Sequence, residues 1–157
     1  MVRLADLPDW ERKHLIEKVP ALPKLGLSPW VFGPPLAKRR VALITTAGLH
    51  LKSDRAFTAE SHNDYRVIPG DVRAGDLVMS QFSVNFDRTG FQRDVNVVFP
   101  IDRVRELAAE GRIGSVADFH YSFMGAGSSI ARYEPAARGL AGLLKKDGVD
   151  AVLLTPV

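Results

Sequence analysis

Residues 144–157 read LKKDGVDAVLLTPV, and this stretch predicts the end of a helix followed at once by a buried strand. Lys145 and Lys146 stand where cations suit the negative pole of a helix dipole. Gly148 follows at a position that favours a left-handed helix cap. The run Val149–Leu154 is apolar at almost every position, as in a parallel strand that is covered on both faces. We therefore expect this strand to lie inside the sheet rather than at its edge.

A second apolar run indicates where a functional site would lie. The segment Val41–Ile44 is continuously apolar and opens into the turn Thr45–Gly48. In open α/β sheets the ligand binds beyond the carboxyl ends of the strands, so this turn and Thr155–Val157 should border one shallow cavity. Backbone N–H groups of such a turn can bind an anion, although composition alone favours a plain strand-to-loop turn. The candidate residues at this edge are Thr45, Thr46, Gly48 and Thr155.

The rest of the pattern predicts an α/β fold with a mostly parallel sheet and helices on both faces, incomplete at the C-terminus. Further strands are expected at Tyr65–Pro69 and Asp76–Gln81. Helices are expected at Pro8–Lys18, amphipathic and capped by Asp6, within Ile101–Gly111 with Asp102 as N-cap, from Ser115 through Phe119, and at Pro135–Lys146.

The chain is expected to divide near residue 39. Residues 1–39 predict an N-terminal helix followed by a Pro-rich arm, because the prolines between Pro20 and Pro35 exclude regular helix and central strand. Trp30 and Phe32 favour an arm that packs on the domain or on a partner. Residues 40–157 predict the α/β domain, which we expect to be the N-terminal part of a longer one.

The composition argues against several classes of function. The chain is 46% hydrophobic and 25% charged, as in a soluble globular protein, and no apolar run is long enough to span a membrane. It lacks an N-terminal signal pattern, so a cytoplasmic location is expected. Without cysteine, these residues contain no disulfide and no thiol nucleophile. The net charge of +3 is spread out, and the basic run Lys38–Arg40 favours a solvated strand end over a nucleic-acid patch.

Polar residues between the strands are further candidates for contact with a substrate. The segment 85–94 is too polar for a core and too charged for a passive turn, and such loops often carry function. Asn85, Asp94 and Asn96 are candidates for orienting a substrate or a neighbouring loop. His120 is the candidate titrating group, with a hydrogen-bonded structural histidine as the equal alternative. The other histidines show no spacing typical of metal ligands, so no metal site is predicted.

Blocks in one order across residues 40–157 resemble a known family. They are Arg40–Lys52, Tyr65–Asp71, Asp94–Arg103, Gly114–Val116 with His120–Gly125, and Asp147–Val157. Together they resemble the selenoprotein B family of glycine, sarcosine, betaine and D-proline reductases, and are most similar to the selenium-containing subunit of the D-proline branch. The arm before residue 40 carries little of the resemblance. Residues 81–93 differ from the histidine- and aspartate-bearing loop of that branch, which leaves the substrate open.

The resemblance implies a selenocysteine directly after Val157, because the matching segment of the family leads into that residue. We therefore expect the chain to be the N-terminal part of a reductase subunit, truncated at a UGA codon and inactive by itself. The family cleaves a C–N bond of a small amino acid or betaine reductively, through a selenolate nucleophile. In the D-proline branch a pyruvoyl group on a partner subunit activates the substrate, and a thiol reductant completes the cycle. No catalytic residue is then expected within the chain.

Two other interpretations of the sequence stay open. One is a complete small α/β module that holds a small anion at Thr45–Gly48. The other is a non-catalytic scaffold subunit whose arm docks on a partner. A truncated sheet would also leave apolar surface beside its last strand, which favours self-association into a homo-oligomer.

Overall fold

The computed structural model describes residues 3–21, 31–58, 64–83, 87–125 and 130–157 of the chain. These residues belong to two compact units, Met1–Val31 and Phe32–Val157. Most of the Pro-rich stretch, including Trp30, lies outside the described residues, so the arm stays a prediction. Where the chain is described again, Phe32 is 89% exposed.

The first unit contains helix α1 (Asp9–Lys18). The predicted amphipathic character is wrong, because no residue of α1 is buried and Trp10 is 73% exposed. Trp10 and Leu15 lie about 140° apart around a helical cylinder, so they cannot share one apolar stripe. Asp6 does not cap this helix, since its carboxylate accepts a hydrogen bond from the N–H of Arg3 instead.

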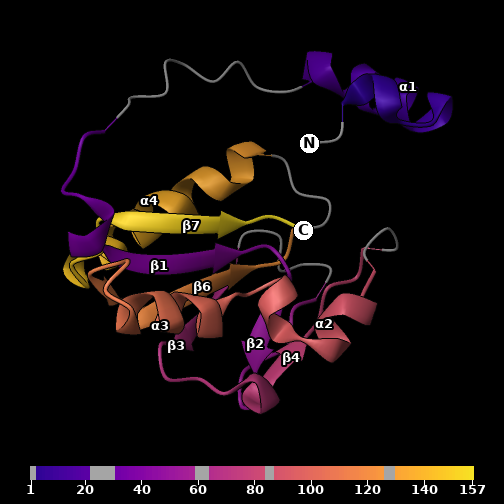
Figure 1. Cartoon of the computed structure of the whole chain (residues 1–157). Coiled ribbons are helices and arrows are strands. Elements are labelled where there is room, and N and C mark those ends of the chain that lie inside the picture. Colours follow the sequence, from indigo (N-terminus) through magenta and orange to yellow (C-terminus); the bar gives the residue numbers. More distant parts are fainter. Residues whose placement is uncertain (1–2, 22–30, 59–63, 84–86, 126–129) are drawn as a thin grey trace. The chain divides into compact units, whose positions relative to one another are not determined.

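Strand β1 (Arg40–Thr45) is the centre of the sheet in the second unit (Figure 1). On one side it pairs in parallel with β7 (Ala151–Thr155). On its other side it pairs in parallel with β5 (Ser115–Val116) and then with β6 (Phe119–Phe123). Strand β3 (Tyr65–Pro69) lies antiparallel to β6. The predicted α/β class with a mostly parallel sheet is therefore confirmed.

Helices pack on the two faces of this sheet, because successive side chains of β1 point to opposite faces. Val41 and Leu43 belong to the larger core cluster, together with residues of α3 (Ile101–Ala109). Ile44 points the other way and packs against α4 (Ile130–Lys146) near Leu140. The continuous apolar run of β1 thus lies between two apolar layers, as expected of a central parallel strand.

Smaller elements lie beside the carboxyl end of β1. Strands β2 (Leu49–Leu51) and β4 (Leu77–Met79) form a separate antiparallel pair directly after the turn that follows β1. The strand predicted at Asp76–Gln81 is therefore present as β4 but shorter. Helix α2 (Thr89–Arg93) then precedes a 3-10 turn at Val95–Val97.

The helix predicted from Ser115 through Phe119 is wrong, because this segment forms β5 and the start of β6. Polar residues disguised the strand: His120 and Ser122 are both fully buried. Each accepts a hydrogen bond from a backbone N–H, of Leu43 and Leu49 respectively, which compensates for the loss of water.

Two predicted helix starts are also wrong. Helix α3 has Pro100 at its N-cap, and the predicted cap Asp102 lies in the first turn. Helix α4 begins at Ile130, so Pro135 lies inside it rather than at its start. An internal proline removes one backbone donor, and the hydroxyl of Tyr133 ties the same region to the Met124 carbonyl at 3.0 Å.

The end of α4 follows the sequence closely. Gly148 has the predicted left-handed conformation, with a φ of 68°. The N–H of Val149 donates to the carbonyl of Leu144 at 2.9 Å and so still closes the helix cap. Strand β7 for that reason begins at Ala151 rather than at Val149.

The position of β7 differs from the prediction of an internal strand. Among the described strands it pairs with β1 alone. Val152, Leu153 and Leu154 are 39%, 44% and 65% exposed. A sequence suited to two covered faces thus has a neighbouring strand on one side only.

Candidate functional site

The carboxyl ends of β1 and β7 meet at one edge of the sheet, as the parallel topology predicts. The N–H of Val157 donates to Thr46 Oγ1 at 2.9 Å, and this hydroxyl donates to the Val157 carbonyl at 3.2 Å. The hydroxyl of Thr45 donates to the carbonyl of Thr155 at 3.2 Å. Both threonines of the turn therefore hold the end of β7 in place.

Thr155 connects this edge to the segment that precedes α3. Its hydroxyl oxygen lies 3.0 Å from the carbonyl oxygen of Val98 and 3.4 Å from that of Ile44. The single hydroxyl proton is used in these contacts. Thr155 therefore links three segments of the domain.

In the turn Thr45–Gly48, the N–H groups of residues 46–48 are all used within the chain, so none of these three is available to bind an anion. The donors bond within the chain: Thr46 to Thr155 at 3.3 Å, Ala47 to the Thr45 hydroxyl at 3.2 Å, and Gly48 to Phe123 at 2.9 Å. Gly48 has a φ of 66°, and a Cβ there would lie 3.0 Å from the nitrogen of Gln81. Glycine is required for this close approach, and the turn joins strands rather than forming an open anion-binding loop.

Asp94 and Asn96 are brought together in a local cap. Asp94 Oδ1 accepts hydrogen bonds from the backbone and side-chain N–H groups of Asn96 at 2.9 and 2.8 Å. The backbone bond is the main reason that the pKa of Asp94 is lowered. Asn96 Oδ1 in turn accepts from the N–H of Asp102 at 3.0 Å, in the first turn of α3. Asn85 lies outside the described residues.

His120 lies within the sheet and is fully buried. Its Nδ1 accepts a hydrogen bond from the N–H of Leu43 at 3.0 Å, and its ring stands edge-on to Phe99. Burial is the main cause that lowers the pKa of His120 to about 4. The ring is therefore neutral at pH 7 and carries its proton on Nε2, which has no hydrogen-bond partner in the described part of the chain. His120 therefore has the geometry expected of a hydrogen-bonded structural histidine.

A hydroxyl–imidazole pair that sequence reasoning missed lies next to the turn. His50 Nε2 is 2.7 Å from Ser80 Oγ, and His50 Nδ1 is 2.7 Å from the carbonyl oxygen of Leu51. A carbonyl only accepts, so Nδ1 carries the proton in the neutral ring and Nε2 accepts from the serine. An oriented imidazole bonded to a hydroxyl is the arrangement that general acid–base chemistry uses.

Short contacts join this pair to the strand ends. The N–H of Ser80 donates to the Gly48 carbonyl at 2.9 Å, and the side chain of Gln81 donates to the Thr46 carbonyl at 3.0 Å. The pairing of β2 with β4 produces this arrangement, since His50 lies opposite Val78. No spacing in the sequence signals a contact between residues so far apart.

An apolar cavity of about 550 Å³ opens at the same edge, between α4 and the strand ends. Ile44, Phe123, Leu140 and Leu154 are among the residues that line it, and no lining side chain is charged. Of the residues predicted to border one cavity, Thr46, Pro156 and Val157 line it, whereas Thr45, Gly48 and Thr155 do not. An ionised amino acid would find no partner for its charges here, so the cavity suits apolar side chains.

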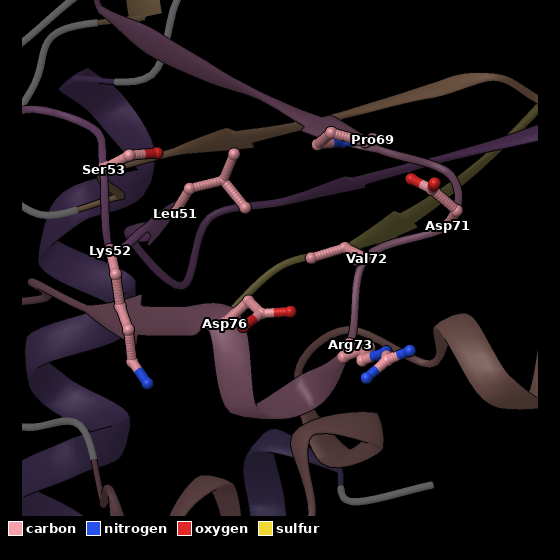
Figure 2. Close-up of a pocket in the computed structure, with 8 residues that line it drawn as sticks. All are labelled: Leu51, Lys52, Ser53, Pro69, Asp71, Val72, Arg73 and Asp76. Carbon is pink, nitrogen blue, oxygen red and sulfur yellow. The ribbon is translucent and has the colours of Figure 1, made fainter.

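A second depression, of about 470 Å³, lies near the ends of β2 and β3 (Figure 2). Charged and apolar residues line it together: Leu51, Lys52, Ser53, Pro69, Asp71, Val72, Arg73 and Asp76. Figure 2 shows that the Lys52 and Arg73 side chains extend on different sides of Asp76 and do not converge on one point. All the charged side chains here belong to exposed residues, so no buried charged group marks a binding site in this depression.

Neither a metal site nor a membrane-spanning helix is found in the part of the chain that the structure describes. No group of histidine and carboxylate side chains there is arranged to hold a metal ion. No helix within the same residues has both the length and the apolar character needed to cross a membrane.

Known proteins similar to this chain are subunits of reductases. It is 41% identical over 116 residues to "D-proline reductase subunit gamma" of Acetoanaerobium sticklandii, which covers 73% of this chain and 47% of that protein. It is 33% identical over 125 residues to "Glycine reductase complex component B subunit gamma" of Carboxydothermus hydrogenoformans, covering 76% and 28%. It is 32% identical over 124 residues to "Sarcosine reductase complex component B subunit beta" of Peptoclostridium acidaminophilum, covering 76% and 28%.

The chain thus spans about half the length of the first of these relatives and less of the others. No solved structure matches it significantly. The family model described as "Glycine/sarcosine/betaine reductase selenoprotein B" matches residues 28–157. That region contains the whole sheet and both helices that cover it, and the chain therefore belongs to the glycine/sarcosine/betaine reductase selenoprotein B family.

Proposed function

We propose that this chain is the N-terminal part of a selenocysteine-dependent reductase subunit, which cleaves a C–N bond of a small amino acid or betaine. The family match over residues 28–157 carries the proposal. The chain contains no cysteine, so under this proposal the redox atom lies elsewhere in the subunit. The greater length of the relatives also supports it, since this chain covers only 47% of the D-proline reductase subunit.

The proposal puts a selenocysteine beyond Val157. The selenol of such a residue is already ionised at neutral pH and so supplies an anionic nucleophile. A cysteine thiol is ionised at neutral pH only where its surroundings lower its pKa. The overall reaction replaces the C–N bond by a C–H bond and an N–H bond, while a thiol reductant provides the two electrons and two protons. Thr45 and Thr46 fit a positioning role, because their hydroxyls bond to Thr155 and Val157. The residues present are therefore compatible with a nucleophile next to this edge.

We propose D-proline as the substrate, in preference to glycine, sarcosine or betaine. The identity to the D-proline reductase subunit is 41%, against 33% for the glycine reductase relative.

We also propose a partner subunit with a pyruvoyl group, in keeping with relatives whose names describe subunits of complexes. The anion-binding module has less support, because the N–H groups of residues 46–48 are already used.

The first test is the DNA that follows the codon for Val157. The proposal expects an in-frame UGA codon, a nearby cysteine codon and a selenocysteine-insertion hairpin, whereas a UAA or UAG codon would overturn it. The 157-residue chain alone should show no reductase activity on D-proline, glycine, sarcosine or betaine with a dithiol reductant. The whole subunit with its partner should reduce D-proline, measured as 5-aminovalerate released. Turnover by the short chain alone would contradict the proposal.

We assign the His50–Ser80 pair to transfer of the proton that the nitrogen takes up when the C–N bond breaks. Replacing Ser80 by Ala or His50 by Asn in the whole subunit should lower kcat about a hundredfold and shift the pH–rate profile. The exposed Ser53, replaced by Ala, is the matched control and should leave both unchanged. If both pair variants keep the pH–rate profile of the unmodified subunit, the pair is structural only.

A further inference from the structure

Strand β7 presents uncovered apolar side chains on both faces of the sheet. In the register with β1, Leu153 lies opposite Leu43 and Leu154 opposite Ile44. Paired residues share a face, so Leu153 lies on the α3 face and Leu154 on the α4 face. The two leucines are 44% and 65% exposed. A strand with this composition normally has cover on both sides.

A hollow accompanies β7 on each face. The apolar cavity of about 550 Å³ lies on the α4 face and includes Leu154 in its lining. A smaller hollow of about 280 Å³ is lined by Val104 and Leu107 of α3 together with Leu153. None of the side chains that line either hollow is charged. Whatever fills them must therefore bring apolar side chains to both faces at once.

The outer edge of β7 also presents its backbone. The N–H of Thr46 donates to the carbonyl of Thr155, which directs the backbone of Thr155 toward β1. Alternate residues of a parallel strand bond to opposite neighbours, so the amides of Val152 and Leu154 face the open edge. An exposed edge of this kind is a template for an added strand.

We propose that β7 and its two hollows are the docking site for a strand and helices from the remaining half of the same reductase subunit. This inference rests on the proposed function, because it uses the residues by which the relatives exceed this chain. The added strand would pair with β7, and apolar helix residues would fill the hollows. A second copy of this chain fits less well. Two copies joined through β7 would set hollow beside hollow and leave both unfilled.

Amide hydrogen exchange tests the backbone part of this proposal. The amides of Val152 and Leu154 should exchange at least about a hundredfold more slowly in the whole subunit than in the 157-residue chain. Equal exchange in the two forms would overturn the docking site. So would a stable dimer of the 157-residue chain in which both amides are protected, because a second copy would then be the occupant.

Matched charge variants test the apolar part. Leu154→Lys should lower the Tm of the whole subunit by about 5 °C or more, and should change that of the 157-residue chain by less than about 2 °C, because the side chain is exposed there. Val67→Lys is the control, since Val67 is 40% exposed on β3, a different strand of the sheet. Equal losses of Tm for both variants in the whole subunit would contradict the proposal.

The same preparations separate this proposal from the proposed function. Protected β7 amides in a whole subunit that does not reduce D-proline, with its partner present, would leave the docking site standing and overturn the function. Activity without protection would do the reverse.

Discussion

Lowering the pH from 7 to about 4 should reduce the free energy of unfolding by about 3 kcal/mol through His120 alone. Folding lowers the pKa of this buried ring from 6.5 to about 4. Well above pH 6.5 the ring is neutral in both states and has no effect. Between these values the unfolded chain binds a proton that the folded chain does not, so stability falls as the pH falls. Urea unfolding measured between pH 7 and 4 gives this slope.

His120→Asn is the control for this pH dependence. Its side-chain oxygen can still accept the N–H of Leu43, but the residue does not titrate. The variant should be less stable at pH 7, because the smaller side chain leaves a void, and should lack the slope between pH 6.5 and 4. Asp147 interferes little in this window: folding lowers its pKa from 3.8, so its contribution begins to be lost only at the lower end of the window and is lost mainly below it. An unchanged slope in the variant would assign the effect to another group.

Replacing Arg40 by Met should destabilise the domain by about 3 kcal/mol. The guanidinium lies 2.6 Å from Asp147 and 2.8 Å from Asp118, and donates to the Val116 carbonyl at 2.8 Å. Asp147 is only 9% exposed, so burial acts to raise its pKa, but Arg40 and two backbone N–H groups lower it overall. Removal of the cation leaves a largely buried carboxylate without its counter-charge.

The pair Arg138–Glu134 is the matched control for this substitution. It is also an ion pair of 2.6 Å, but its side chains are 78% and 61% exposed. Arg138→Met should cost less than about 0.5 kcal/mol, because exposed pairs are weak. Both free energies come from urea unfolding at pH 7. A cost for Arg40→Met as small as that of the control would show that the buried pair is not needed for stability.

Continuous apolar runs and turn residues in the sequence were sufficient to predict part of the fold. Strand β3 has the predicted bounds, and β1 and α3 differ only at their ends. Strand β6 was missed because its buried polar side chains made the segment look unlike a strand. Val41 lies opposite Val116 but Ile44 lies opposite Tyr121, so the pairing register with β1 shifts between β5 and β6. The N–H of Leu43 therefore donates to the His120 side chain rather than to a backbone carbonyl.

The candidate site was predictable where it depends on chain direction. Parallel strands bring their carboxyl ends together, and the contact of Thr46 with Val157 follows from that rule. The His50–Ser80 pair depends instead on the register of two short strands, which no periodicity in the sequence specifies. Asp94 and Asn96 were candidates for orienting a substrate or a neighbouring loop, because loop polarity alone cannot distinguish a binding group from a helix cap.

The pairing of β1 with β7 has a consequence for folding kinetics. Thr45 and Thr155 are in contact across 110 residues, so the central strand meets one of its neighbours only after residue 155 has been synthesised. Domains with such long-range contacts fold slowly, since a long loop must close before the contact forms. Until then one edge of an apolar, β-branched strand stays open in the nascent chain, and such edges drive aggregation. Dilute conditions or a chaperone during synthesis should therefore raise the yield of this domain.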